Sequence, residues 1–472
     1  MKVIVLGTGF VGLTHAAVLA ERGLTVVACD IDSKKLAAFS SGEAEQIERY
    51  VNEPGLSGCV RQALSSGCLQ FTTDATPHLE DATAVFLCLP TPASQSGATN
   101  LTPYRASLRE LIKALSKSPR VERLLLINKS TVPIGTAHGL ARELEAAGIR
   151  EVGVASNPEF LPQGEALEAS RRPSRVVVGA EHEADFAIMR RIYAPYVDHG
   201  RIGYLETTPE TAEAVKYVSN ALLFTYVSFW NGVAARLGET IESVRMSDLR
   251  LGVTSDARIS AWGSHVGSGA GGSCFGKDLR SLAFQMRALG LDTDLLEGVL
   301  AINEVQKTYL IERAEQELGV DFEGKAVAIA GLSFKKNTDD LHDSSAVTLI
   351  ESLLARGVKS IRAYDPIVTE ECARRHLDCS RNPGFERVEY FRAAERAIEG
   401  SDALFISNDS DEFHGLTRVI RQTVAPPYAV IDGRRMLADA SVLIQAGYGY
   451  LCVGESARKT LASTKAGEDV AA

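Results

Sequence analysis

The stretch KVIVLGTGFVG, residues 2–12, decides the fold of the N-terminal part of the chain. Its apolar start predicts a strand over residues 2–6, and the pattern that follows Gly12 predicts a helix that continues to about residue 22. A second apolar run, residues 25–29, is closed by Asp30. The first turn carries the spacing G-x-G-x-x-G, and an acid follows 18 residues after the last glycine. Together these features predict a βαβ unit that binds a dinucleotide.

The residue types in this unit suit one cofactor class. Gly7, Gly9 and Gly12 let backbone N–H groups approach a pyrophosphate at the start of a helix. Asp30 would accept hydrogen bonds from the adenosine ribose and would repel a 2'-phosphate, which favours NAD over NADP. Lys35 is a nearby cation that could soften this preference. The alternative is a glycine-rich turn with a purely structural role, but the flanking strand and helix favour the nucleotide.

Strand-like and helix-like segments continue to alternate after this unit. Apolar runs that predict strands occupy residues 84–89, 124–128, 152–155 and 175–179, and the run at 175–179 is predicted to be the last strand. The second α/β pattern starts near residue 324, with predicted strands at residues 326–330, 360–364, 403–407 and 428–431 completing it. We therefore expect two doubly wound, Rossmann-like α/β domains with parallel sheets.

A long helical stretch separates the two α/β patterns, over residues 208–237. A helix in this place commonly serves as a spine and as a dimer face. The expected division is residues 1–205 for the first α/β domain with its NAD-binding turn, 206–318 for a central helical region, 319–454 for the second α/β domain, and 455–472 as a disordered tail.

Composition excludes several classes of protein. The chain has 472 residues, 45% hydrophobic and 23% charged, which is typical of globular domains. The net charge of −10 argues against non-specific nucleic-acid binding but permits an anionic small substrate. No apolar run reaches the ~20 residues of a membrane helix, and the N-terminus does not resemble a signal peptide. The eight cysteines form no C-x-x-C pair, so we expect no metal site, no disulfide framework and a reducing cytoplasm.

One cysteine differs from the other seven in its neighbours. Cys274 lies in GGSCFGKD, residues 271–278, where flanking glycines let a substrate approach closely. Lys277 would favour its thiolate, and Asp278 could orient a water molecule or act as a base. The alternative is an ordinary buried cysteine, which is the interpretation we give to the other seven.

Two further segments carry chemistry-bearing residues. Lys216 and Asn220 are four residues apart, hence on one face of the long helix. Its aromatic residues, Tyr217, Phe224, Tyr226 and Trp230, predict a largely buried helix, so Lys216 needs an anionic partner. The alternative is a solvated surface pair. Glu159, after a predicted strand, could act as a base or position water, or could simply be a carboxylate at a helix start. The turn GLSFKK, residues 331–336, lacks the dinucleotide spacing, but its two lysines suit a phosphate or nucleotide.

Taken together, these motifs resemble the UDP-glucose/GDP-mannose dehydrogenase family over residues 1–454. The matching segments, in order, are residues 7–12, 53–56, 90–92, 130–136, 157–161, 271–278, 334–340 and 432–435. The resemblance implies oxidation of the C6 alcohol of a nucleotide sugar to a carboxylate with two NAD molecules. Cys274 would add to the aldehyde intermediate, and the resulting thiohemiacetal would be oxidised to a thioester that water hydrolyses.

The resemblance implies that residues 206–318 serve dimerisation and carry a catalytic cysteine, and that residues 319–454 bind the nucleotide sugar. It also implies roles for single residues. Lys216, Asn220 and Asp278 match positions that handle the oxyanion, the catalytic water and proton transfer, and Thr131 and Glu159 match water-binding and acid/base positions. The implied cofactor contacts are Gly7, Gly9, Phe10, Val11, Gly12, Asp30, Lys35, Thr91, Ser130, Lys277 and His342. The implied substrate contacts are Phe160, Leu161, Lys216, Asn220, Arg258, Gly271, Phe275, Phe334, Lys335 and Arg434. Arg258 matches an arginine that reaches the substrate of a partner subunit, which implies a homodimer or a higher homo-oligomer.

Departures from the family pattern leave alternatives open. Gln163 replaces a second acid, Ala270 an aromatic residue, Gly276 a proline, and His342 an arginine that contacts the cofactor. The form around Cys274 favours UDP-glucose and the product UDP-glucuronate. The alternatives are the same reaction on GDP-mannose or another UDP-sugar, a two-electron hydroxyacid dehydrogenase, and a catalytically silent nucleotide-sugar-binding subunit.

Overall fold

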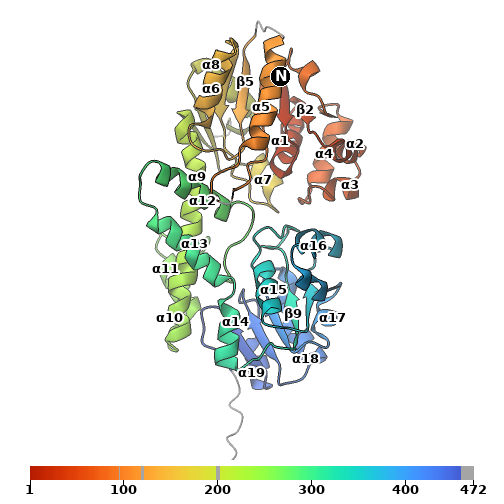
Figure 1. Cartoon of the computed structure of the whole chain (residues 1–472), viewed down its shortest axis with the longest axis vertical. Coiled ribbons are helices and arrows are strands. Elements are labelled where there is room, and N and C mark those ends of the chain that lie inside the picture. The colour runs from red at the N-terminus through yellow and green to blue at the C-terminus, as the bar shows by residue number, and fades with distance from the viewer. Residues whose placement is uncertain (95, 118–121, 198–201, 459–472) are drawn as a thin grey trace, which may run out of the picture. The chain divides into compact units, whose positions relative to one another are not determined.

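A computed structural model of the chain describes residues 1–94, 96–117, 122–197 and 202–458 (Figure 1). The chain divides into two compact units. The first contains Met1–Ala221 and Lys277–Thr293, and the second contains Leu222–Gly276 and the chain from Asp294 onward. The residues of the predicted segment 206–318 are thus shared between the units. Of the predicted tail, residues 459–472 lie outside the described residues.

The first unit is built on an eight-stranded sheet with the order β3-β2-β1-β4-β5-β6-β7-β8. Neighbouring strands are parallel except for β6 and β7, which pair antiparallel. Its strands are β1 (Lys2–Leu6), β2 (Thr25–Cys29), β3 (Leu69–Thr72), β4 (Ala84–Leu87), β5 (Leu124–Asn128), β6 (Val152–Ser156), β7 (Arg175–Ala180) and β8 (Gly203–Thr207). The prediction that residues 175–179 form the last strand is wrong, because β8 follows and pairs with β7.

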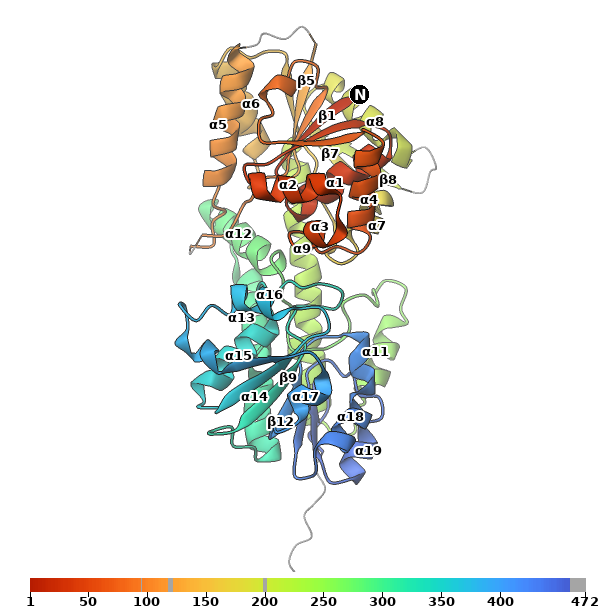
Figure 2. The same cartoon turned by 90° about the vertical axis from the view of Figure 1, so that its right-hand side faces the viewer.

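Helices cover both faces of this sheet because its strands are apolar on both sides (Figure 2). Val3 and Val5 of β1 point into a core shared with α1 (Phe10–Glu21), α2 (Ser33–Ser41), α3 (Ala44–Glu48), α4 (Leu56–Ser65), α7 (Ala166–Arg171) and α8 (Glu183–Val197). Ile4 of the same strand points into the opposite core, with α5 (Thr102–Lys117) and α6 (Thr136–Ala146). The parallel strands therefore present their carboxyl ends at one edge, where ligand sites of such sheets lie.

The second unit is built on six parallel strands in the order β11-β10-β9-β12-β13-β14. They are β9 (Ala326–Ala330), β10 (Ser360–Tyr364), β11 (Val388–Phe391), β12 (Ala403–Ile406), β13 (Ala429–Asp432) and β14 (Gly449–Cys452). One face packs on α14 (Tyr309–Arg313) and α15 (Ser345–Ala355), and the other on α17 (Ala394–Ile398), α18 (Leu416–Thr423) and α19 (Ala440–Gln445). The prediction that residues 428–431 complete this domain is wrong, because β14 lies beyond them.

A long helix connects the sequences of the two units. α9 spans Pro209–Phe229 and passes through a π-helical turn, Trp230–Ala234, into α10 (Ala235–Thr240) (Figure 1). Tyr217, Phe224 and Trp230 are buried, whereas Leu222 and Phe229 are 68% and 53% exposed. The expectation of a largely buried helix is therefore wrong: one face is buried, and an apolar face is open.

The remaining helices are α11 (Met246–Thr254), α12 (Phe275–Ala288), α13 (Asp294–Gln306) and α16 (Glu370–His376). The predicted fold class is confirmed: two doubly wound α/β sheets linked in sequence by a long helix. Among the described residues, no helix has the length and apolar character needed to cross a membrane.

Candidate active site

The turn between β1 and α1 is tightly packed at Gly7 and Gly12 and open at Gly9. Gly7 has a φ of +90°, and a Cβ there would lie 2.2 Å from the carbonyl oxygen of Cys88. A Cβ on Gly12 would lie 1.9 Å from the Gly7 oxygen, whereas one on Gly9 would meet no atom within 4 Å. In the described chain no side chain caps the start of α1 at Phe10 and Val11, so its N–H groups remain available to a phosphate.

Asp30 stands at the carboxyl end of the neighbouring strand. One of its oxygens accepts hydrogen bonds from the Thr8 N–H at 2.8 Å and from Lys35 Nζ at 2.5 Å. Burial raises the pKa of this carboxyl, but the hydrogen bonds from Lys35, Thr8 and Asp32 outweigh burial and lower it. The open turn, the uncapped helix start and the ionised Asp30 fit the pyrophosphate and ribose of a dinucleotide.

A pocket lies within the first unit, where the polypeptide leaves β5 and β6. It is lined by Asn128, Ser130, Thr131, Val132, Ser156, Pro158, Glu213 and Lys216. The pocket therefore brings together Ser130, Thr131 and Lys216, which come from two distant parts of the sequence. Ser130 Oγ also accepts the Leu89 N–H at 2.7 Å, which ties the loops after β4 and β5 to each other. Thr91, in the loop after β4, is half-buried.

Lys216 forms a buried ion pair with Glu159. Its Nζ lies 2.8 Å from Glu159 Oε1, and both side chains are less than 10% exposed. Burial alone would raise the pKa of Glu159, but the charge and hydrogen bond of Lys216, with the Leu161 N–H and the charge of Lys129, lower it below its ordinary value. Glu159 is the anionic partner that the sequence required for Lys216, and it is a carboxylate at neutral pH.

The residues after Glu159 in the sequence hold the pair in place. The Leu161 N–H donates to Glu159 Oε2 at 2.6 Å. The Arg175 guanidinium carbon lies over the Phe160 ring, 3.9 Å from the ring centroid, and Lys216 Nζ lies 5.6 Å from the same centroid. Two cationic groups thus lie near one aromatic ring at the start of the loop.

A second buried polar group joins α9 to α12. Asn220 donates from Nδ2 to one oxygen of Asp278 at 2.6 Å, and Lys277 Nζ lies 2.5 Å from the other. Asp278 is fully buried. Asn220 lies one helical turn beyond Lys216, so the two pairs lie on one face of α9.

Lys129 and Glu213 are buried charged groups that the sequence reasoning missed. Lys129 Nζ donates to Asn157 Oδ1 at 3.0 Å, and burial lowers its pKa to about 8. Glu213 accepts the N–H groups of Gly135 and Ala137 at 2.6 and 2.9 Å, while burial raises its pKa to about 7. The signal for Lys129 was its position directly after an apolar strand and before Ser130 and Thr131. No comparable signal marks Glu213, which resembles an ordinary helix-surface acid.

Cys274 belongs to the second unit and directly precedes α12. It is exposed, and its sulfur lies 3.7 Å from Ser273 Oγ. The two glycines before it allow close packing of a neighbouring loop. A Cβ on Gly271 would lie 2.4 Å from the Asp343 oxygen, and one on Gly272, where φ is +91°, would lie 2.9 Å from the Phe334 ring.

Phe334, Lys335 and Arg434 gather beside this glycine pair. Lys335 Nζ lies 5.8 Å from the Phe334 ring centroid. The Arg434 guanidinium donates to the carbonyl oxygens of Ser407, Gly269 and Phe334 at 3.1, 3.3 and 3.5 Å. Burial lowers the pKa of Arg434. The structure therefore brings Gly271, Phe334, Lys335 and Arg434 together within the second unit.

The remaining predicted residues make contacts of their own. Phe275 stacks on Phe224, with ring centroids 5.6 Å apart. The Arg258 side chain is 87% exposed and pairs with Asp256 at 2.5 Å. His342 lies 2.5 Å from Asp340. Gln163 is half-buried.

Sequence models of one family match three consecutive parts of the chain. The NAD binding domain of the UDP-glucose/GDP-mannose dehydrogenase family matches residues 1–197. The central domain of that family matches residues 210–305, and its UDP binding domain matches residues 328–439.

Individual relatives match nearly the whole chain. A UDP-glucose 6-dehydrogenase of Pseudomonas aeruginosa is 34% identical over 96% of this chain and 97% of its own length. The UDP-glucose 6-dehydrogenase TuaD of Bacillus subtilis is 32% identical over 97% of this chain and 94% of its own. A solved UDP-glucose dehydrogenase structure from Pyrobaculum islandicum superposes with a TM-score of 0.82 and 31% identity, covering 92% of this chain and 94% of that one. The chain therefore belongs to the UDP-glucose/GDP-mannose dehydrogenase family, and it is an NAD-dependent dehydrogenase.

Proposed function

We propose that the protein oxidises the C6 hydroxyl of UDP-glucose to a carboxylate and so forms UDP-glucuronate. The observation that carries this proposal is the full-length match to relatives that are named UDP-glucose 6-dehydrogenases. The overall reaction consumes one UDP-glucose, two NAD and one water, and it yields UDP-glucuronate, two NADH and three protons. The division of labour follows the predicted segments 1–205, 206–318 and 319–454.

In the first oxidation, C6 loses a hydride and its hydroxyl loses a proton. When bound, NAD accepts the hydride in each of the two oxidations. Gly7, Gly9, Phe10, Val11, Gly12, Asp30, Lys35, Thr91, Ser130, Lys277 and His342 would hold the cofactor. The Lys216 ammonium and the Asn220 amide stabilise negative charge on the sugar oxygen. Glu159, kept ionised by Lys216, accepts the proton through a water molecule bound by Thr131.

Cys274 captures the aldehyde before it can leave. Its thiolate forms a bond to C6, and the carbonyl oxygen takes a proton to give a thiohemiacetal. A second hydride then leaves C6, the hydroxyl loses its proton, and a thioester remains. The exposure of Cys274 and the glycines before it support this role, because a substrate carbon can reach the sulfur.

Hydrolysis then releases the product and restores the thiol. Water adds to the thioester carbonyl, the C6–sulfur bond breaks, and the sulfur leaves as a thiolate. Asp278 orients this water and takes its proton, which accounts for a carboxylate held in place by Asn220 and Lys277.

The substrate's nucleotide and sugar are held by residues outside the catalytic group. Phe334, Lys335 and Arg434 contact the nucleotide, where a diphosphate needs cationic donors. Phe160, Leu161, Gly271 and Phe275 contact the sugar and its neighbouring groups. The fixed position of Arg434, with three carbonyl partners, supports its role in a preformed site.

We further propose that the protein is a homodimer of the reducing cytoplasm. The open apolar face of α9 and α10 includes Leu222, Phe229, Val233 and Leu237, which are 68, 53, 44 and 45% exposed. A second copy would remove this surface from water. Arg258, whose side chain is 87% exposed, is then available to the partner's substrate.

A panel of nucleotide sugars tests the substrate. Purified protein is mixed with NAD and UDP-glucose, UDP-N-acetylglucosamine, UDP-galactose or GDP-mannose, and NADH formation and product mass are measured. We expect kcat/KM for UDP-glucose to exceed the others by at least ~10-fold, with a product that is a uronate. A preference for GDP-mannose would contradict the substrate, and tight binding without NADH would contradict the catalytic role.

A further inference from the structure

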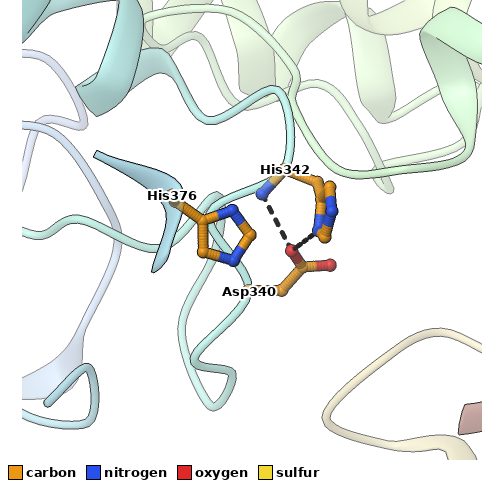
Figure 3. Close-up of side chains that lie close together, drawn as sticks. All are labelled: Asp340, His342 and His376. Carbon is orange, nitrogen blue, oxygen red and sulfur yellow. Dashed lines mark hydrogen bonds and ion pairs between the residues drawn. The ribbon is translucent and has the colours of Figure 1, made fainter. Parts of the chain in front are cut away.

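Three side chains of types that can bind a metal come together from two separate segments of the second unit (Figure 3). Asp340 and His342 come from the loop between β9 and α15, and His376 is the last residue of α16. One oxygen or nitrogen from each residue lies within 4.8 Å of the other two. The loop and the helix are distant in sequence, so the fold itself creates this group.

The contacts within the group leave coordinating atoms available. Asp340 Oδ1 accepts the backbone N–H of His342 at 2.8 Å and lies 2.5 Å from His342 Nδ1 (Figure 3). The His376 ring stands edge-on to the His342 ring, with centroids 4.6 Å apart. Within the described residues, Asp340 Oδ2 and both ring nitrogens of His376 have no hydrogen-bond partner.

The exposure of these side chains suits entry of an ion from solvent. The Asp340 side chain is only 11% exposed, whereas that of His342 is 64% exposed and His376 is half-buried. The mostly buried carboxylate is fixed by the backbone of His342, and the exposed imidazole can turn without disturbing the core. The group thus combines one anchored ligand with one that is free to adjust.

We propose that Asp340, His342 and His376 bind a divalent transition-metal ion of the zinc class. Two imidazole nitrogens and one carboxylate oxygen are a donor set that Zn²⁺ prefers, with water in the fourth position. Mg²⁺ and Ca²⁺ prefer all-oxygen sites and are disfavoured here. Ligand atoms about 2.1 Å from a tetrahedral ion lie roughly 3.4 Å apart, so the 2.5 Å contact between Asp340 Oδ1 and His342 Nδ1 needs to open by about 1 Å to admit the ion. The ligand atom of His376 lies within 4.8 Å of both. On binding, the ion replaces the proton between Asp340 and His342, which leaves to solvent.

The proposed metal would connect α16 to the glycine turn before Cys274. The carbonyl oxygen of His342 accepts the Gly272 N–H at 2.9 Å, and the same loop packs on Gly271. A bound ion would therefore restrain a loop that contacts this turn. The metal site does not depend on the substrate proposed above, and no cysteine takes part in it.

Direct metal binding to the full-length protein tests the site. Chelator-treated protein is titrated with Zn²⁺ by calorimetry and with Co²⁺ by visible absorption. We expect one Zn²⁺ per chain and a Co²⁺ ligand-field band, with affinity at least ~10-fold weaker for both His342→Ala and His376→Gln. His182→Gln, which changes an exposed histidine of the first unit, should bind like the wild type.

Two results would overturn the proposal. One is the absence of binding near one equivalent, and the other is equal affinity of the wild type and the two variants, which would place the ion elsewhere. Mg²⁺ at the same concentrations should give no saturable heat. Circular dichroism checks folding of each variant, and if His376→Gln does not fold, the exposed His342→Ala decides the outcome.

Discussion

Burial of the Lys216–Glu159 pair costs free energy of folding, but the pairing keeps Glu159 ionised. Both groups are removed from water, and desolvation of two charges can exceed the attraction between them. The pair persists because Leu161 and Lys129 add further stabilisation to the carboxylate. Glu159, the proposed base, is therefore already ionised in its buried position.

Removal of Lys216 alone should lower the free energy of unfolding, and removal of Glu159 as well should restore most of it. Lys216→Met leaves the buried Glu159 carboxylate without its cation, and we expect a loss of roughly 3–5 kcal/mol in the free energy of unfolding. Glu159→Gln combined with Lys216→Met should recover most of it. Denaturant unfolding of both variants measures this.

The matched control is Lys113→Met on α5. Lys113 pairs with Glu110 in an exposed i,i+3 arrangement at 3.8 Å, and its loss should cost less than ~1 kcal/mol. If Lys216→Met is no more destabilising than this control, the buried pair does not have the role described.

Glu213 predicts a dependence of stability on pH. Its pKa is about 7 in the folded protein, whereas an ordinary glutamate has a pKa of 4.5. Between these values the folded state keeps a proton that the unfolded state has released, so stability falls as the pH rises. Relative to Glu213→Gln, the free energy of unfolding of the wild type should fall by on the order of 3 kcal/mol across this pH range. Unfolding free energies from pH 4.5 to 8 measure the difference.

The amide in Glu213→Gln adds a constant cost at every pH, so the slope carries the test. Glu145→Gln, an exposed acid on α6, is the control and should follow the wild-type curve. Parallel curves for the wild type and Glu213→Gln would show that Glu213 titrates at its ordinary pKa.

Single residues were predictable where the residue type itself is unusual in its place. Cys274 between glycines, Asp30 after a strand and a lysine on an apolar helix each stand out in the sequence. Lys129 and Glu213 do not, because their burial results from the packing of β5, α6 and α9, which no local pattern encodes. Whether Cys274 acts as proposed stays a prediction.

At the scale of elements, the sequence predicts the central strands well and the edges poorly. The four strands that it missed, β3, β8, β11 and β14, are the edge strands of the two sheets. Three of these strands, β3, β8 and β11, are buried less and carry polar residues, as in the sequences LQFT and VEYF. The fourth, β14, is mostly buried, but its sequence GYLC is only four residues long. A short run of this kind has neither the apolar continuity of a central strand nor a clear alternation.

The sequence does not show what covers the open apolar face of α9 and α10. Leu222→Glu places a charge on this face, and we expect it to raise the dissociation constant of the dimer by at least ~10-fold. Sedimentation velocity over a range of concentrations measures it. Ser116→Glu, with the same charge change on an exposed position of α5, should leave the dimer intact. A wild-type monomer with full activity would contradict the proposed assembly.

At the scale of the whole molecule, one chain carries a dinucleotide turn, a buried acid–base group, an exposed cysteine and a second α/β sheet. The family match assigns an NAD domain to the first sheet and a UDP domain to the second. The order of these parts was evident from the sequence, since each motif follows its own strand. The relation between them in catalysis is the proposal that needs measurement.

The number of NADH molecules formed per UDP-glucose tests the central claim most directly. With limiting UDP-glucose and excess NAD, the account predicts two NADH per sugar for the wild type and for Cys379→Ala, and no more than one for Cys274→Ala. One NADH per sugar from the wild type, or two from Cys274→Ala, would contradict the claim that Cys274 captures the aldehyde and holds it for the second oxidation.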